Sequence, residues 1–331
     1  MTSGAPQCST PDGARVVLAK GDFQSLLDLL WGRAYRVIGP RVSQGAIVYD
    51  DVHQVDDLPN GWTDEQSAGQ YRLKRREDDA LFGYVVGPHS WKQYLFPPQV
   101  TVATADRTGD GWQLRDVLPD EPAYAFLGVR ACELAALAVQ DRTFMRDQYT
   151  DPIYRQRRER ALIIAVNCTQ AASTCFCTSM NTGPRCKSGF DLALTELSDR
   201  FTVEVGSQRG ADILAQLPTV AADARELNQA EAARQQAVDQ ITKRLDTTGI
   251  RDLLLANLEH PRWAEVATRC LSCTNCTMVC PTCFCSSVKE VSDLDGSHVE
   301  RVRQWDSCFN WDFSYLNGGI VRNHTRSRYR Q

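Results

Sequence analysis

The stretch CLSCTNCTMVCP, residues 270–281, places Cys270, Cys273, Cys276 and Cys280 in the spacing C-x2-C-x2-C-x3-C, followed by a proline. This spacing is that of the bacterial ferredoxin ligand run for a [4Fe–4S] cluster. Three thiolates two residues apart can surround one face of an iron–sulfur cube, and the proline then redirects the chain so that the fourth thiolate points away. A structural zinc site usually separates its two C-x2-C pairs more widely. The spacing therefore favours an iron–sulfur cluster over zinc.

The run leaves one ligand unassigned. In two-cluster ferredoxins the fourth cysteine of each run binds the other cluster, and this sequence contains one complete run. Three alternatives follow from the residues alone. Cys280 closes its own cube, or a nearby cysteine (Cys283, Cys285 or Cys308) supplies the missing thiolate, or the partner run lies outside this chain.

Composition indicates a soluble globular protein. The 331 residues carry a net charge of −4, which disfavours a general nucleic-acid binder. The start has no apolar secretory region, and no apolar run is long enough to span a membrane. The thirteen cysteines are bunched in C-x-C and C-x2-C pairs rather than spread as a disulfide framework. We therefore expect a cytoplasmic protein whose cysteines bind metal.

Hydrophobic patterning predicts two domains, with a boundary near residue 220. Residues 123–129 and 161–166 are expected to be buried strands, and the first is followed by a turn and a helix at 134–139. Apolar residues at helical spacing predict a long amphipathic helix over 227–245. The expected fold is an α+β or α/β domain over residues 1–220, followed by a helical, ferredoxin-type [4Fe–4S] domain over residues 221–331.

A second set of cysteines follows the two expected strands. Cys132 stands at the start of the expected helix, and Cys168 comes directly after the second strand. The sequence TCFC at 174–177 adds Cys175 and Cys177, and it is repeated at 282–285. Because neighbouring strand ends are where α/β folds build sites, Cys132, Cys168, Cys175 and Cys177 could supply four thiolates to a further cluster. The alternative is that they are buried apolar cysteines.

Three other segments have simpler expected roles. Residues 1–20 are polar and predicted to be loosely structured, with Cys8 a free thiol. His89, Ser90 and Lys92 could contact an anionic ligand, but the favoured prediction is a capped turn with a solvated lysine. The segment 322–331 is expected to be a solvated or partner-facing basic tail, since it carries Arg322, Arg326, Arg328 and Arg330.

Several blocks of the sequence together carry a resemblance to a known family. They are residues 87–92 (GPHSWK), 128–134 (GVRACEL), 167–168, 174–177, 189–193 (GFDLA), 270–285 and the block from 305 to 331. With these blocks the chain resembles the beta, iron–sulfur electron-transfer subunit of cytoplasmic NAD(P)-linked [NiFe] hydrogenases, the sulfhydrogenases. It is also similar to the A-subunit of anaerobic sulfite reductase.

The resemblance implies that the chain binds one or more [4Fe–4S] clusters and belongs to a hetero-oligomeric redox complex in the cytoplasm. It also implies that the chain binds neither nucleic acid nor a membrane. The chain would relay electrons between a catalytic subunit and a flavin/NAD(P)-binding subunit, without a catalytic site of its own. The family pattern continues into a second cysteine run, which would complete the site of Cys270, Cys273 and Cys276 and take Cys280 as a ligand. This sequence lacks that run. Two alternative functions are a part of the anaerobic sulfite reductase complex and, in another class, a non-redox zinc-binding scaffold subunit.

Overall fold

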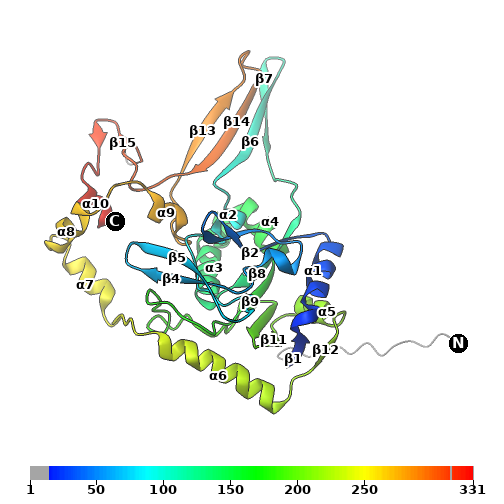
Figure 1. Cartoon of the computed structure of the whole chain (residues 1–331). Helices are drawn as coiled ribbons and strands as arrows, with labels where there is room; N and C mark the ends of the chain where they lie inside the picture. Colours follow the sequence, from blue (N-terminus) through cyan, green and yellow to red (C-terminus); the bar gives the residue numbers. More distant parts are fainter. Residues whose placement is uncertain (1–14, 314, 331) are drawn as a thin grey trace. The chain divides into compact units, whose positions relative to one another are not determined.

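The computed structural model describes residues 15–313 and 315–330 (Figure 1). Cys8 lies outside these residues, as does most of the segment that was expected to be loose. That expectation is wrong for its last part, because β1 (Arg15–Ala19) is an ordered strand that pairs antiparallel with β11. Val17 and Leu18 of this strand are buried, and their burial stabilises the pairing.

Contacts divide the chain into two compact units. The first comprises Met1–Trp91, Glu121–Thr150 and Arg155–Asp246, and the second comprises Lys92–Asp120, Asp151–Tyr154 and Thr247–Gln331. The domain boundary near residue 220 stays a prediction. The long helix α6 (Ala224–Gln240) belongs to the first unit, where Arg200 forms an ion pair with its Glu226 at 2.7 Å.

The first unit is built on an eight-stranded sheet with the order β12-β1-β11-β10-β9-β8-β2-β3. The central pairs β2–β8, β8–β9 and β9–β10 are parallel, and the other pairs are antiparallel. The strands not yet bounded are β2 (Tyr35–Ser43), β3 (Ala46–Asp51), β8 (Ala123–Val129), β9 (Leu162–Val166), β10 (Leu192–Glu196), β11 (Arg200–Val205) and β12 (Thr219–Ala221). A separate antiparallel pair consists of β4 (Trp62–Ser67) and β5 (Gln70–Arg75).

The predicted strands at 123–129 and 161–166 are confirmed as β8 and β9. Every residue of β9 is buried, as expected of a central parallel strand that is covered on both faces. Helix α1 (Phe23–Gly32) buries Phe23, Leu26, Leu27 and Leu30, whose spacing is that of one helical face. The other helices whose residues lie mainly in this unit are η1 (Lys20–Asp22), η2 (Val55–Asp57), α3 (Ala131–Phe144), η3 (Asp147–Tyr149), α4 (Pro152–Arg160) and α5 (Gln208–Leu214).

The second unit contains a four-stranded antiparallel sheet in the order β13-β14-β6-β7 (Figure 1). Its strands are β6 (Gln99–Thr108), β7 (Gly111–Asp116), β13 (Ser286–Ser292) and β14 (His298–Trp305). The expectation of a helical C-terminal domain missed this sheet, because β14 pairs with a strand that lies far earlier in the sequence. The remaining elements are α2 (Lys92–Leu95), α7 (Ile250–Ala256), α8 (Arg262–Thr268), α9 (Asn275–Val279), β15 (Tyr315–Leu316), β16 (Gly319–Ile320) and α10 (Thr325–Tyr329).

One arginine of the expected basic tail is packed rather than solvated. Arg328 of α10 is buried, and its guanidinium donates to the backbone carbonyls of Phe309 at 2.8 Å and Arg322 at 3.0 Å. Tyr329 packs edge-on against Phe309 with ring centroids 5.0 Å apart. The expectation of a solvated or partner-facing basic tail is therefore wrong for Arg328, whereas Arg326 is exposed. Among the described helices, none is long and apolar enough to cross a membrane.

Candidate metal centres

Two neighbouring strand ends position the first two N-terminal cysteines. Cys132 stands in the first turn of α3, which begins directly after β8, and Cys168 follows β9. Because β8 and β9 pair in parallel, their carboxyl ends lie at the same edge of the sheet. The structure thus places these two cysteines where the sequence predicted them, at adjacent strand ends.

The long loop after β9 brings two further cysteines toward this edge. A Cβ atom added to Gly183 would lie 3.1 Å from the Sγ atom of Cys177 and 3.3 Å from the Cβ atom of Ala131, so Cys177 lies close to the start of α3. Negative charge on each of the three other thiols would raise the pKa of Cys132, so all four are electrostatic neighbours. We refer to this set as the N-terminal cysteine group: Cys132, Cys168, Cys175 and Cys177.

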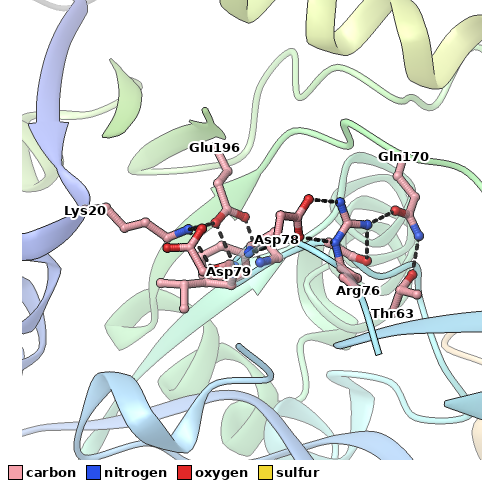
Figure 2. Close-up of polar contacts among 11 residues, drawn as sticks. Lys20, Thr63, Arg76, Asp78, Asp79, Gln170 and Glu196 are labelled. Carbon is pink, nitrogen blue, oxygen red and sulfur yellow. Dashed lines mark hydrogen bonds and ion pairs between the residues drawn. The ribbon is translucent and has the colours of Figure 1, made fainter. Parts of the chain in front are cut away.

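Polar side chains fix the loop that carries Cys175 and Cys177. Arg76 donates to the side-chain oxygen of Gln170, and Gln170 donates to Thr63 of β4 (Figure 2). Further along the same network, Glu196 accepts hydrogen bonds from the backbone N–H groups of residues 81 and 82 at 2.6 and 2.7 Å. The loop is therefore tied to two other segments of the first unit before any metal is bound.

Buried charged groups lie beside the N-terminal cysteine group. The guanidinium of Arg130, which is 1% exposed, donates to the backbone carbonyls of Phe82 and Tyr84 at 2.8 and 3.0 Å. Glu133 accepts a hydrogen bond from the hydroxyl of Tyr49 at 2.6 Å and from the backbone N–H of Arg130 at 2.8 Å. Each buried charge thus has polar partners, which offset part of the cost of burial.

The four thiols favour their protonated forms. Burial raises the pKa of each of them, and for Cys177 it does so, together with charge on Cys168 and Cys175, to about 11. At Cys168 the charge of Arg130 opposes this effect. Iron binding would displace the thiol protons, because only thiolates bind the metal. The positive charge of the iron would then offset the repulsion between the thiolate sulfur atoms.

The C-terminal run is positioned by turns and short helices rather than by strand ends. Cys270 follows α8, and Cys276 lies within α9. Ser272 and Thr274 adopt positive φ angles of 52° and 66°, which residues other than glycine rarely do. The chain therefore turns sharply between the first three cysteines, as the predicted ligand loop requires. Cys273 and Cys276 are exposed to solvent.

The later cysteines of the C-terminal region form a separate set of contacts. The sulfur of Cys280 contacts the Thr282 hydroxyl at 3.3 Å. Burial and the interaction with the neighbouring Cys280 thiol raise the pKa of Cys283 to about 12. Burial acts to raise the pKa of Cys280, but hydrogen bonds from Thr282 and Cys283 and the charge of Lys92 together lower it.

Lys92 lies beside the C-terminal cysteines, although a solvated side chain was predicted for it. The side chain is 2% exposed, and its ammonium donates to the backbone carbonyls of Thr277 at 3.3 Å and Cys283 at 3.2 Å. It also lies 4.0 Å from the centre of the Trp305 ring. The prediction of a solvated lysine is therefore wrong. The only sequence signal was its place in the block GPHSWK.

Within the described chain, no group of three His, Cys, Asp or Glu side chains converges closely enough to hold one metal ion. The donor set, which consists of thiols, is the one that iron–sulfur clusters use.

Comparison with known families identifies the C-terminal region as an iron–sulfur domain. Residues 269–331 match the family described as 4Fe-4S dicluster domain. The match contains the whole ferredoxin-type run and also Cys283, Cys285 and Cys308. The predicted cofactor is thereby confirmed, and the chain is a [4Fe–4S] protein.

The comparison with curated proteins confirms the predicted resemblance to sulfhydrogenase beta subunits. The chain is 30% identical over 205 residues to sulfhydrogenase 2 subunit beta of Pyrococcus furiosus, a match that covers 61% of this chain. The matched part spans 60% of the length of that relative. No solved structure matches the chain.

Proposed function

We propose that the chain is an iron–sulfur electron-transfer subunit that relays electrons between a catalytic hydrogenase subunit and a flavin/NAD(P)-binding subunit. The observation that carries the proposal is the ferredoxin-type run, Cys270 to Cys280, inside the matched 4Fe-4S dicluster domain. The sulfhydrogenase relative favours a hydrogenase complex over one with anaerobic sulfite reductase. We assign no catalytic residue to this chain.

In this proposal the protein holds and tunes the redox group. A bound [4Fe–4S] cluster supplies a centre that accepts and returns one electron. The thiolates of Cys270, Cys273 and Cys276 would bind iron, which requires that their protons leave to solvent. The backbone N–H of Ser272 donates a hydrogen bond to the sulfur of Cys270 at 3.3 Å. Such bonds to ligand sulfur atoms change the reduction potential of a cluster.

The first test removes single ligands from protein made and kept anaerobic. Cys273→Ser should lose one cluster, about four irons and four acid-labile sulfides per chain, together with its EPR signal on reduction. Cys8→Ser is the matched control and should keep the full content. The proposal fails if Cys270→Ser, Cys273→Ser and Cys276→Ser each retain the iron, the sulfide and the reducible signal. Zinc in place of iron and sulfide would instead support the scaffold function.

The relay itself is tested in the assembled complex. With Cys273→Ser, reduction of NAD(P) by hydrogen should fall at least tenfold. Dye reduction driven by hydrogen at the catalytic subunit should persist, as should dye reduction driven by NAD(P)H at the flavin subunit. This pattern locates the defect between the two half-reactions. If all three activities stay at the wild-type level in a complex that lacks the cluster, this centre is not part of the relay.

We also propose that the N-terminal cysteine group binds a cluster of its own. Its support is the placement of Cys132 and Cys168 at adjacent parallel strand ends, with Cys177 close to the start of α3. Cys168→Ser should lose iron and sulfide while the signal that depends on Cys273 stays. If Cys168→Ser and Cys177→Ser both keep the wild-type iron content and spectra, these residues are structural cysteines without a metal role.

A further inference from the structure

A buried arginine lies at the sheet edge that carries the N-terminal cysteine group. Arg130 is the single residue between β8 and α3, and it stands two positions before Cys132. Because β8 pairs in parallel with β9, Arg130 and Cys168 follow neighbouring strands at the same edge of the sheet. Arg130 is 1% exposed. A permanent positive charge is thus buried beside strand ends that carry two of the four predicted ligands.

Two backbone carbonyls and an aromatic ring hold the guanidinium of Arg130 in place. Its Nη2 atom donates to the carbonyl of Phe82 at 2.8 Å and to that of Tyr84 at 3.0 Å. The guanidinium also lies over the ring of Tyr84, 4.7 Å from its centre. These partners are dipoles and a ring rather than a carboxylate. They therefore orient the guanidinium without neutralising its charge.

The segment that supplies these carbonyls, residues 81–85, is itself fixed by two buried carboxylates. Glu196 accepts hydrogen bonds from two backbone N–H groups of the segment, at 2.6 and 2.7 Å. Asp64 accepts from a third at 2.8 Å. Glu196 also forms an ion pair with Lys20 at 3.2 Å (Figure 2). The guanidinium is therefore bonded to backbone that has little freedom to move.

The charge of Arg130 is left available to the cysteines. The carboxylate of Glu133 accepts hydrogen bonds from the hydroxyl of Tyr49 and from the backbone N–H of Arg130 rather than from its guanidinium. The buried Nε atom of Arg130 has no hydrogen-bond partner among the described residues, and such a donor is costly until an acceptor reaches it. Burial raises the pKa of Cys168 and of Cys175, and the positive charge of Arg130 opposes this effect at both thiols.

We propose that Arg130 is the fixed counter-charge of the cluster that the N-terminal cysteine group binds, and that its charge raises the reduction potential of this cluster. The inference rests on the proposed cluster of that group and adds the residue that tunes it. With four thiolate ligands a [4Fe–4S] cube is negatively charged, and its reduced state carries one more negative charge than its oxidised state. A buried cation beside the thiolates therefore stabilises the reduced state more. The step moves one electron, which a reduced partner centre supplies, and Arg130 keeps its protons throughout.

The charge is tested by redox titration of the full-length chain, with the EPR signal that Cys168→Ser removes as the readout. Arg130→Gln removes the charge and keeps a side-chain donor for the carbonyls. It should make this centre at least tenfold harder to reduce, a fall of about 59 mV for one electron. Arg130→Lys retains the charge and should restore most of the potential.

Arg160→Gln is the matched control for the loss of one positive charge. Arg160 is exposed and lies next to the amino end of β9, the opposite end from Cys168, so the potential should stay at the wild-type value. The counter-charge role fails if Arg130→Gln shifts the potential no more than this control, or if Arg130→Lys shifts it as much as Arg130→Gln. A wild-type chain without a centre that depends on Cys168 would instead overturn the proposed N-terminal cluster.

Iron content and circular dichroism separate the role of the charge from a structural role. Arg130→Met is a second neutral variant and should lower the potential as Arg130→Gln does. If both neutral variants lose the centre but keep the native circular dichroism spectrum, and Arg130→Lys keeps the centre, the cluster needs the charge in order to bind, which supports the inference. Loss of the native spectrum in the neutral variants, or loss of the centre in Arg130→Lys as well, would contradict it, because Arg130 would then serve the fold.

Discussion

The two regions that carry cysteines are built by different kinds of structure. The N-terminal cysteine group lies at the carboxyl ends of buried parallel strands. The loop that carries Cys175 and Cys177 is held by the hydrogen bond between Arg76 and Gln170. The C-terminal run lies on turns and on the short helix α9 (Figure 1). A buried sheet is stable without metal, whereas a loop of this kind has little apolar burial of its own. The first region should therefore keep its shape when empty, and the second should depend on its cluster.

Removal of iron should produce the largest difference between the two regions. Backbone amides of residues 270–285 should exchange with solvent about a hundredfold faster in the apo-protein, because cluster binding contributes the local stability that this loop lacks. Amides of β8 and β9 should change little, because these strands are buried in the centre of the sheet. Hydrogen exchange followed by mass spectrometry measures both regions in one sample.

Chain reconstituted anaerobically with iron and sulfide is the control and should recover the slow exchange. Equal loss of protection in β9 and in residues 270–285 would contradict the comparison. It would mean that the first unit also needs metal in order to fold.

Substitution of Gly210, a closely packed glycine of the first region, should have the next largest effect. Gly210 packs so closely on the backbone of Asp191 that an added Cβ would lie 2.0 Å from its carbonyl oxygen. Asp191 in turn accepts a hydrogen bond from the backbone N–H of Ile163 in β9 at 2.8 Å. Gly210→Ala should therefore lower the free energy of unfolding by about 3 kcal/mol. Urea denaturation followed by circular dichroism measures it.

Gly32→Ala is the matched control, because nothing lies within 4 Å of its added Cβ atom. That variant should unfold at nearly the same urea concentration as the wild type. In Gly210→Ala, the EPR signal that depends on Cys168 should weaken, while the signal that depends on Cys273 should persist. Loss of both signals at equal rates would show that the two regions do not fold separately.

The sequence predicted those parts of the molecule that local patterns determine. The strands β8 and β9 follow from short runs of apolar residues, and the strand ends then place Cys132 and Cys168. The spacing of the ferredoxin-type run identified the cofactor, because ligand spacing is itself local. These predictions needed no knowledge of which distant segments meet.

The features that were missed depend on contacts between distant segments. β14 pairs with β6, and His298 is thereby opposite Asp106, although 192 positions separate them. Lys92 is buried against Thr277 and Cys283, which are 185 and 191 positions further along the chain. The polar sequence of β13 and β14 gives little strand signal, since neither face of this sheet is deeply buried. No local pattern distinguishes such a lysine from a solvated one.

The two regions should also differ, more weakly, in their response to pH. The sheet of the second unit exposes an ion pair between His298 and Asp106, whose atoms lie 2.7 Å apart. The hydrogen bond with Asp106 raises the pKa of His298 above its ordinary value of 6.5. A raised pKa means that the folded state binds the proton more tightly than the unfolded state. The stabilisation is therefore fully present below pH 6.5 and is lost as the pH rises through the raised value.

Amides of the β6–β14 ladder should accordingly exchange slightly faster at pH 8 than at pH 6, after correction for intrinsic exchange rates. The effect is small, because both side chains are exposed and salt screens them. NMR titration of the His298 ring should give a raised pKa in the wild type and a lower one in Asp106→Asn, in which Glu300 still acts to raise it. Central strands β8 and β9 contain no titratable side chain except Tyr124, so their exchange should not follow this pH range. If His298 titrates at its ordinary value in the wild type, the ion pair does not stabilise this sheet, and the predicted pH difference between the two regions disappears.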